Sequence, residues 1–183
     1  TLGTEWLNTT SGEMYICTDA TAGANVWTNV GAGEGDIVPY KHGGGRGVWA
    51  GGQNPSNVNT MDYVAIATTG NATDFGDLTG TRAGCSGNSS GSRGVYAGGY
   101  SSINVIDYIT FSTPGNAVDF GDLTVGRGYI GSCSNGTRGV WGGGLIPSTH
   151  QTNTIDYVTL ASTGNAVDFG DVTVARYALS GCS

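Results

Sequence analysis

The sequence predicts an all-β protein built from repeated small sheets. Three copies of one unit follow each other, beginning at Arg46, Arg93 and Arg138, with starts 47 and 45 residues apart. Short runs rich in Val, Ile, Thr and aromatic residues alternate with turns of Gly, Asn and Ser, which is the pattern of strands joined by tight turns. Apolar residues do not recur with the period of a helix. Four short strands per repeat of about 46 residues are typical of one blade of a β-propeller.

The strands can be placed within the first repeat and transferred to the other two. We expect strands over 46–52 and 61–68, a tight turn with a third strand over 69–77, and a fourth strand in the stretch after Arg82. The distance from Asp62 to Asp74 is 12 residues, and the equivalent distance is the same in every repeat. Only the segment between the first two strands changes length, so it is expected to be an exposed loop.

The composition excludes two classes of partner. Seven basic residues stand against 14 acidic ones, which gives a formal charge of −7. Binding to nucleic acid or to an anionic membrane needs clustered Lys and Arg. No apolar run reaches the roughly 18 residues of a membrane helix. We therefore expect no nucleic-acid partner and no membrane insertion.

Most charged residues occupy repeat positions, which argues against catalysis. An active site needs one constellation of groups and not three copies of the same pair. We therefore expect ion pairs within or between sheets, an architecture that fixes register, and we predict no catalytic residue, no enzyme activity and no cofactor. The structural residues assigned in this way are Arg82, Arg127, Arg176, Asp62, Asp107 and Asp156.

The repeated motif GNAVDFGD has residues that could form a metal site. It offers hard oxygen ligands of the kind that calcium accepts. The weak calcium candidates are Asp74, Asp77, Asp119, Asp122, Asp168 and Asp171. Asn and Asp that hydrogen-bond within their own turn, with Gly supplying a positive φ, explain the motif more simply. We therefore predict no metal site.

The loops of variable length are the best candidates for binding. They span Gln53–Thr60, Tyr100–Asn104 and Leu145–Thr154 and are rich in amide and hydroxyl groups. Such groups bind sugar hydroxyls, and an aromatic side chain can stack on a sugar ring. The candidate ligand-binding residues are Gln53, Asn54, Tyr100 and His150. The simpler interpretation is that these loops are only solvated.

Two further sets of residues are expected in the core. Trp49, Tyr96 and Trp141 share one repeat position, which favours packing between sheets. The chain has four cysteines, and the last three lie on the same expected strand of successive repeats: Cys17, Cys85, Cys133 and Cys182. We interpret the cysteines as small buried apolar residues, with disulfides left open as the alternative.

The repeat resembles the kelch repeat, a propeller family that includes the central domain of galactose oxidase. The resemblance covers residues 43–183 and is carried by Arg82, Gly98, Gly99, Asp107, Tyr108 and Arg127. The kelch tryptophan after the tyrosine is missing, and Phe75, Phe120 and Phe169 stand slightly later. No pattern of copper ligands is present, so the resemblance implies a fold and not an oxidase activity.

Two segments resemble structural proteins of tailed phages, including those that infect cyanobacteria. Residues 153–171 are similar to repeat arrays in such proteins. The N-terminal segment is similar to a hairpin module of phage fibres, through Trp6, Asn8, Thr9, Thr10, Gly12, Tyr15 and Trp27. The resemblance implies a virion protein (a fibre, an appendage or a capsid-decorating protein) that is extracellular and contacts other virion proteins and host-surface glycans. The alternative is a secreted or cell-surface lectin.

The expected organisation is an attachment module over 1–40 and three repeats over 41–183, with approximate bounds of 46–92, 93–137 and 138–183. Three blades do not close a propeller, which usually has four to eight. One hypothesis is that Tyr177–Ser183 completes the first blade of a neighbouring copy. Two chains would then make a homo-oligomer of six blades, and more chains would make a larger ring, or a filament if the rotation does not close. The alternatives are a fragment of a longer propeller, a self-contained three-fold β-trefoil or β-prism, and a divergent fourth blade in residues 1–40.

Overall fold

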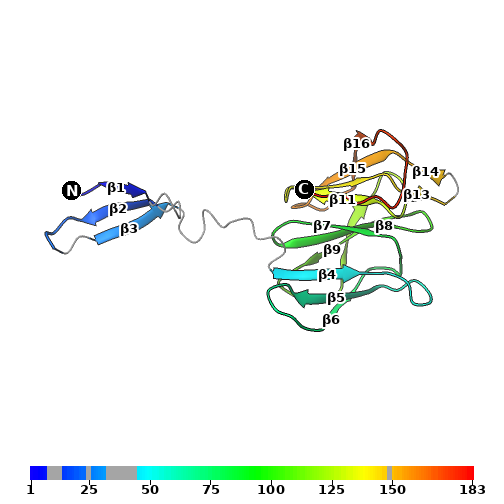
Figure 1. The fold of residues 1–183 in the computed structure, drawn as a ribbon, viewed down its shortest axis with the longest axis horizontal. Coiled ribbons are helices and arrows are strands. Elements are labelled where there is room, and N and C mark those ends of the chain that lie inside the picture. Colours follow the sequence, from blue (N-terminus) through cyan, green and yellow to red (C-terminus); the bar gives the residue numbers. More distant parts are fainter. Residues whose placement is uncertain (8–13, 24–25, 32–44, 148–149) are drawn as a thin grey trace. The chain divides into compact units, whose positions relative to one another are not determined.

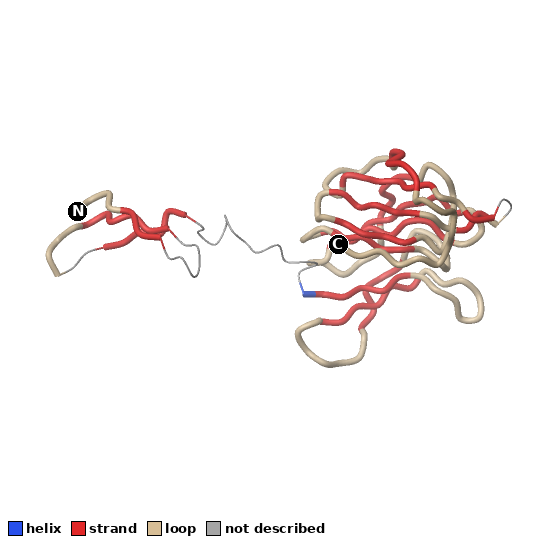
Figure 2. The backbone as a smooth tube through the Cα atoms, turned by 45° about the horizontal axis from the view of Figure 1, so that its top comes forward, coloured by secondary structure: helices blue, strands red, loops and turns tan. Residues whose placement is uncertain are grey.

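The computed structural model describes residues 1–7, 14–23, 26–31, 45–147 and 150–183. These residues form 16 strands in five antiparallel sheets and no α-helix, which confirms the all-β prediction (Figures 1 and 2). The chain divides into two compact units, Thr1–Lys41 and His42–Ser183.

The N-terminal unit is a three-stranded sheet. Its strands are β1 (Glu5–Leu7), β2 (Met14–Asp19) and β3 (Val26–Gly31), in the order β1-β2-β3. Trp6 and Tyr15 face each other across β1 and β2, with ring centroids 5.4 Å apart. Cys17 is its buried residue, at 2% exposure. Asn8, Thr9, Thr10 and Gly12, which help to carry the phage-fibre resemblance, lie outside the described residues.

The C-terminal unit contains three sheets that follow one another along the chain. The first sheet holds β4 (Arg46–Ala50), β5 (Thr60–Ala65) and β6 (Thr73–Asp77). The second sheet holds β7 (Ser86–Ser89), β8 (Arg93–Gly99), β9 (Ile103–Thr110) and β10 (Val118–Asp122). The third sheet holds β11 (Gly131–Ser134), β12 (Arg138–Gly142), β15 (Thr154–Thr159) and β16 (Val167–Asp171). The hairpin of β13 (Leu145–Ile146) and β14 (His150–Gln151) lies between β12 and β15 in the chain.

The sheets are offset from the sequence repeats by one strand. β7 precedes Arg93 in the sequence, yet it pairs with β8 and so belongs to the second sheet. The first sheet consequently has three described strands where the repeat predicts four. The predicted strand at Tyr177–Ser183 is not a strand in the structure, because no neighbouring strand forms a ladder with it there.

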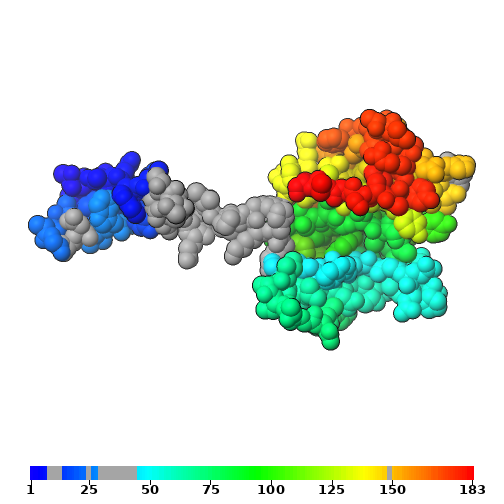
Figure 3. All heavy atoms as spheres, in the orientation of Figure 1, coloured from blue at the N-terminus to red at the C-terminus, as the bar shows by residue number. Residues whose placement is uncertain are grey.

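The three sheets are stacked as layers (Figures 1 and 3). An apolar core fills each contact between them. Met61 and Phe75 of the first sheet pack with Tyr96 and Ile109 of the second. A separate core joins the second and third sheets, and its members include Val95, Ile106, Phe120, Trp141 and Val158. The second sheet is therefore covered on both faces, and β8 is buried from Gly94 to Gly99. The described sheets do not close into a ring.

Each sheet repeats one local packing motif. An arginine that begins one strand lies over the ring of a tyrosine of the next strand. The distance from the guanidinium carbon to the ring centroid is 5.0 Å for Arg46 over Tyr63, and 4.5 and 4.8 Å for the equivalent pairs in the second and third sheets. In each sheet that tyrosine meets a phenylalanine edge-on, as Tyr108 meets Phe120 at 6.0 Å. The phenylalanine of the DFGD motif therefore packs on the tyrosine of the repeat.

Neighbouring sheets approach each other closely at a bulge in the DFGD strand. The register shifts between Asp119 and Gly121, where Gly121 adopts a φ of 146°. A Cβ at Gly121 would collide with the backbone of Gly164 in the next sheet. This contact explains why the DFGD motif requires its glycine.

Candidate functional site

Two buried ion pairs join the sheets. Arg127 and Asp156 are both fully buried, with 2.7 Å between Nη1 and Oδ2. Arg127 also donates from Nε to the carbonyl oxygen of Gly143 at 2.8 Å. Thr124, which follows the second sheet, donates its N–H and its hydroxyl to Asp156 at 3.2 and 2.6 Å. The carboxylate therefore ties the end of one sheet to the interior of the next.

The same arrangement occurs one repeat earlier. Arg82 pairs with Asp107, which is fully buried. Thr79 donates its N–H and its hydroxyl to Asp107 at 3.0 and 2.7 Å. The two clusters differ at one atom, since the buried Nε of Arg82 has no hydrogen-bond partner among the described residues whereas that of Arg127 does. Because the pair recurs with the repeat and each carboxylate is occupied by an arginine and a threonine, we interpret it as a contact that positions the sheets.

Asp62 and Arg176 hold the same repeat positions but are exposed. No described residue forms an ion pair with either one. Arg176 donates to the carbonyl oxygen of Val174 at 3.3 Å, just as Arg127 donates to Val125. They differ from their counterparts because Asp62 lies in the first sheet and Arg176 follows the last.

The weak calcium candidates lie on the β6, β10 and β16 strands. Asp74, Asp119 and Asp168 are exposed, Asp77 and Asp122 are half-buried, and Asp171 is exposed. Among the described residues, no three His, Cys, Asp or Glu side chains gather closely enough to hold a metal ion. The asparagine of the motif bonds between sheets and not within its own turn as predicted: Asn116 and Asn165 accept from the N–H groups of Asp77 and Asp122, both at 3.1 Å.

The three variable loops lie at one end of the stack, because each joins equivalent strands of its sheet (Figure 1, right). Gln53 and Asn54 follow β4, Tyr100 follows β8, and His150 belongs to the β13–β14 hairpin; all four are exposed. The backbone bends sharply in two of these loops, with φ of 77° at Ser101 and 86° at His150. The four predicted residues are therefore exposed residues of loops at this end of the stack.

A row of tyrosines lies at this same end of the stack. Tyr100, Tyr129 and Tyr177 are between 41% and 47% exposed, with ring centroids 5.8 and 6.4 Å apart along the row. Backbone bonds hold it in place: Tyr100 N–H donates to Ala83 and Tyr129 N–H to Gly84, both at 2.7 Å. We name these three tyrosines with Gln53, Asn54 and His150 the loop surface.

Sequence reasoning missed Tyr129 and Tyr177. Tyr129 is the second residue after Arg127, and Tyr177 is the first residue after Arg176. The first repeat has Gly84 and Ala83 at these two positions. Because the tyrosines do not share one repeat position, the repeat pattern did not mark them. Flat exposed rings beside amide and hydroxyl groups can stack on an apolar ligand face while the polar groups hydrogen-bond its rim.

The cysteines occupy different environments. All four are free: Cys17 is buried, Cys85 and Cys133 are half-buried, and Cys182 is exposed. The thiol of Cys85 approaches the carbonyl oxygen of Ala50 at 3.5 Å, and burial raises its pKa above the usual value. The prediction of burial is therefore right for Cys17 and wrong for Cys182, which follows the last sheet.

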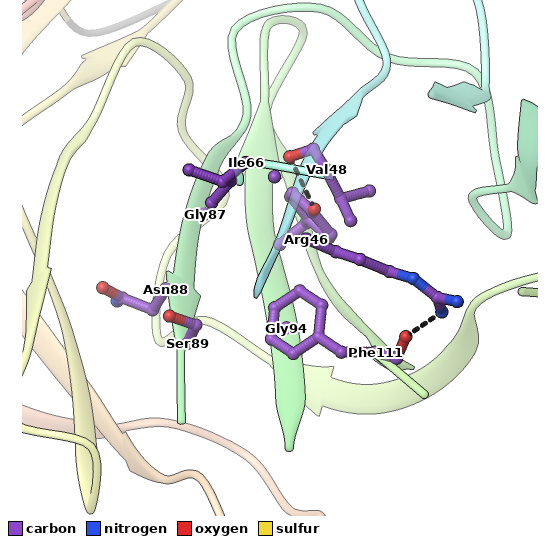
Figure 4. A pocket seen from close by; sticks show the side chains of 10 residues that line it. Arg46, Val48, Ile66, Gly87, Asn88, Ser89, Gly94 and Phe111 are labelled. Carbon is purple, nitrogen blue, oxygen red and sulfur yellow. Dashed lines mark hydrogen bonds between the residues drawn. The ribbon is translucent and has the colours of Figure 1, made fainter. Parts of the chain in front are cut away.

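Each of the two units also has a concave feature. Trp6, Tyr15 and Trp27 of the N-terminal unit line a hollow of about 410 Å³. A groove of about 280 Å³ runs between β4 and β7, lined by Arg46, Val48 and Ile66 on one side and Gly87 and Asn88 on the other (Figure 4). In the groove Arg46 reaches across to the carbonyl oxygen of Phe111.

Comparison with known proteins does not assign a family. No protein-family model matches the chain, and no curated protein matches it. In the described part of the chain, no helix has the length and apolar character needed to cross a membrane.

Proposed function

We propose that the chain is a non-enzymatic structural protein of a tailed-phage virion, a fibre, appendage or capsid-decorating protein whose loops contact host-surface glycans. The observation that carries the proposal is the loop surface: exposed tyrosines in a row, beside three loops whose lengths vary on a repeated scaffold. Loops held by rigid sheets are a common place for binding residues.

The scaffold is proposed to be a set of kelch-like propeller blades. Two separate cores, one on each face of the second sheet, support this interpretation. A β-trefoil or β-prism would gather all three repeats around one shared core, so stacked layers favour the propeller over those folds. The fixed spacing of Arg, Gly-Gly and Asp-Tyr supports the kelch type.

The repeated ion pairs support a structural role for the charged residues. Arg82, Asp107, Arg127 and Asp156 are buried, and a neighbouring threonine donates to each of the two carboxylates. A scaffold of this kind needs no cofactor for the proposed role.

The N-terminal unit is proposed to attach the protein to other virion proteins. Its aromatic hollow supports this proposal, since Trp6 and Trp27 are 52% and 42% exposed. Exposed tryptophans that line one hollow are typical of protein interfaces. The proposed location is therefore the outside of a virion.

Glycan binding can be tested directly on the full chain with a glycan array. Tyr100→Ala should abolish or strongly weaken any signal, because one stacked aromatic contributes most of the contact area at such a surface. Val118→Ala is the matched control, because Val118 is 55% exposed and lies on β10. No glycan signal from the unmodified chain, or equal signals from both variants, would contradict the proposed loop surface.

The alternative, a secreted or cell-surface lectin, is favoured by the same tyrosines. Mass spectrometry of purified phage particles separates the two. The chain in stoichiometric amounts supports the virion role, whereas sugar-competed binding with no association with particles supports the lectin.

A further inference from the structure

Each contact between sheets uses the same set of groups, so the chain holds two complete copies of one junction. A junction contains a Thr–Asp–Arg cluster, an Asn-to-backbone bond and a buried aromatic residue. Between the second and third sheets these are the cluster at Asp156, the bond from Asp122 to Asn165, and Trp141. Between the first and second sheets they are the cluster at Asp107, the bond from Asp77 to Asn116, and Tyr96.

The free face of the first sheet presents one half of a third junction. Trp49 is 61% exposed, whereas Tyr96 and Trp141 at the same repeat position are 8% and 0% exposed. Ile66 is 68% exposed, although its counterparts Phe111 and Leu160 are 7% and 0%. Asp62 is exposed and Asp107 and Asp156 are fully buried. We name Trp49, Asp62 and Ile66 the leading face.

The free face of the third sheet presents the other half. Phe169 is 54% exposed, against 2% for both Phe75 and Phe120. A Cβ at Gly170 would meet no atom within 4 Å, whereas one at Gly76 or Gly121 would collide with the next sheet. We name Phe169, Gly170, Thr173 and Arg176 the trailing face, with Thr173 at the repeat position of Thr79 and Thr124.

Residues 177–183 lie where the first strand of a further sheet would lie, in the same way as β7 and β11 begin the second and third sheets. Gly84, Tyr129 and Ala178 occupy one repeat position and have φ of 72°, 54° and 56°. Tyr129 N–H donates to Gly84 at 2.7 Å, and Ala178 N–H donates to Tyr129 at 2.8 Å. Residues 177–183 therefore stand beside β11 as β11 stands beside β7.

The first sheet lacks this strand among the described residues. β4 pairs with β5 on one edge, and no described strand pairs with its other edge. β7 and β11 are the first, edge strands of the second and third sheets. The groove between β4 and β7 lies where the first sheet would hold the equivalent strand (Figure 4). Among the described residues, the edge of β4 that has no partner strand and the segment 177–183, which belongs to no described sheet, are complementary.

We propose that the trailing face of one copy of this chain docks on the leading face of a second copy, and that two copies close a ring of six sheets. Arg176 and Thr173 of one copy bind Asp62 of the other, and Trp49 is covered by the third sheet of its partner. Tyr177–Ser183 supplies the fourth strand of the partner's first sheet. The charges match, since the exposed acid and the exposed base are the two halves of the buried pairs.

Two copies are the number that fits a ring. A contact between two different faces gives a closed ring or an open filament. Two chains give six sheets, within the four to eight that propellers usually have, whereas three chains would give nine. This interface does not depend on the proposed virion role or on glycan binding.

Native mass spectrometry and light scattering of the full chain over a wide concentration range test the proposal. We expect a particle of twice 18.6 kDa. A buried interface tryptophan commonly contributes 2 kcal/mol or more, so Trp49→Ala should weaken each contact about thirtyfold. Because the ring holds two such contacts, the dissociation constant of the dimer should rise roughly a thousandfold.

Three further variants sharpen the test. Asp62→Arg should dissociate the ring by placing two arginines together, and combining it with Arg176→Asp should restore part of the association. Val118→Ala, an exposed apolar residue outside both faces, should leave the dimer unchanged. A monomer at every concentration, a particle larger than two chains, or a dimer that survives both Trp49→Ala and Asp62→Arg would overturn the proposal. Circular dichroism confirms that each variant is folded, since Trp49 and Asp62 are exposed within one chain.

Discussion

The buried pair of Arg127 and Asp156 gives a quantitative prediction about stability. Arg127→Met removes the cation and leaves a fully buried carboxylate whose described partners are the groups of Thr124. Removing one partner of a buried pair costs about 3–5 kcal/mol. The carbonyl oxygens of Gly143 and Trp141 also lose their donor. The loss is a large share of the 5–15 kcal/mol by which a typical domain is stable.

Guanidinium denaturation followed by circular dichroism measures this loss, with all variants at one protein concentration. Asp119→Asn is the control, because Asp119 is an exposed repeat aspartate and its replacement should change stability by less than about 0.5 kcal/mol. Arg127→Met combined with Asp156→Leu should be more stable than Arg127→Met alone, because it removes the stranded charge.

The reasoning would be refuted by a loss below about 1 kcal/mol for Arg127→Met, the size expected for an exposed pair. A double variant less stable than the single variant would also contradict it. Arg127→Lys gives a folded comparison, since it keeps the charge but loses the planar set of donors. Its stability should lie between those of the unmodified chain and Arg127→Met.

Two more predictions concern buried groups that titrate. Burial raises the pKa of Tyr96, whose hydroxyl donates to the carbonyl oxygen of Val48 at 3.0 Å. The folded state therefore keeps a proton that the unfolded chain releases above about pH 10, so stability should fall as the pH rises past that value. Tyr96→Phe should cost about 1 kcal/mol at neutral pH and make the alkaline decline shallower in pH-dependent denaturation; an equally steep decline would assign it to other groups. Burial also raises the pKa of Cys85. At pH 8 this thiol should therefore react with iodoacetamide much more slowly in the folded chain than after unfolding, which mass spectrometry of peptides measures. Equal rates would mean that the thiol is accessible.

The repeat was the part of the fold that the sequence could predict. The strands around Trp49, Asp107 and Asp156 follow from alternation and fixed spacing, since both are local properties of the chain. The sequence also marked Arg82 and Arg127 as ion-pair residues. It could not show that Thr79 and Thr124 complete those pairs, because that contact depends on how far one sheet is rotated against the next.

The loop surface was less predictable for the same reason. Gln53, Asn54, Tyr100 and His150 could be found from the variable loops. Tyr129 and Tyr177 could not, because they become neighbours of Tyr100 only when the sheets stack. The different exposures of Trp49 and Trp141 likewise depend on the position of their sheet in the stack and not on the residues around them in the chain.

The nearest-neighbour character of the stack has a consequence for how such a protein changes over generations. Each described sheet is joined to the next through one standard set of groups: arginine, aspartate, threonine and asparagine. Recombination that gains or loses a whole repeat therefore leaves every remaining contact chemically intact, as in other modular arrays. Loop lengths can differ between repeats at the same time, since the loops contribute backbone groups and no side chain to the Thr–Asp–Arg clusters. The exposed loops of such a protein can therefore change in sequence and length while the contacts between its sheets stay the same.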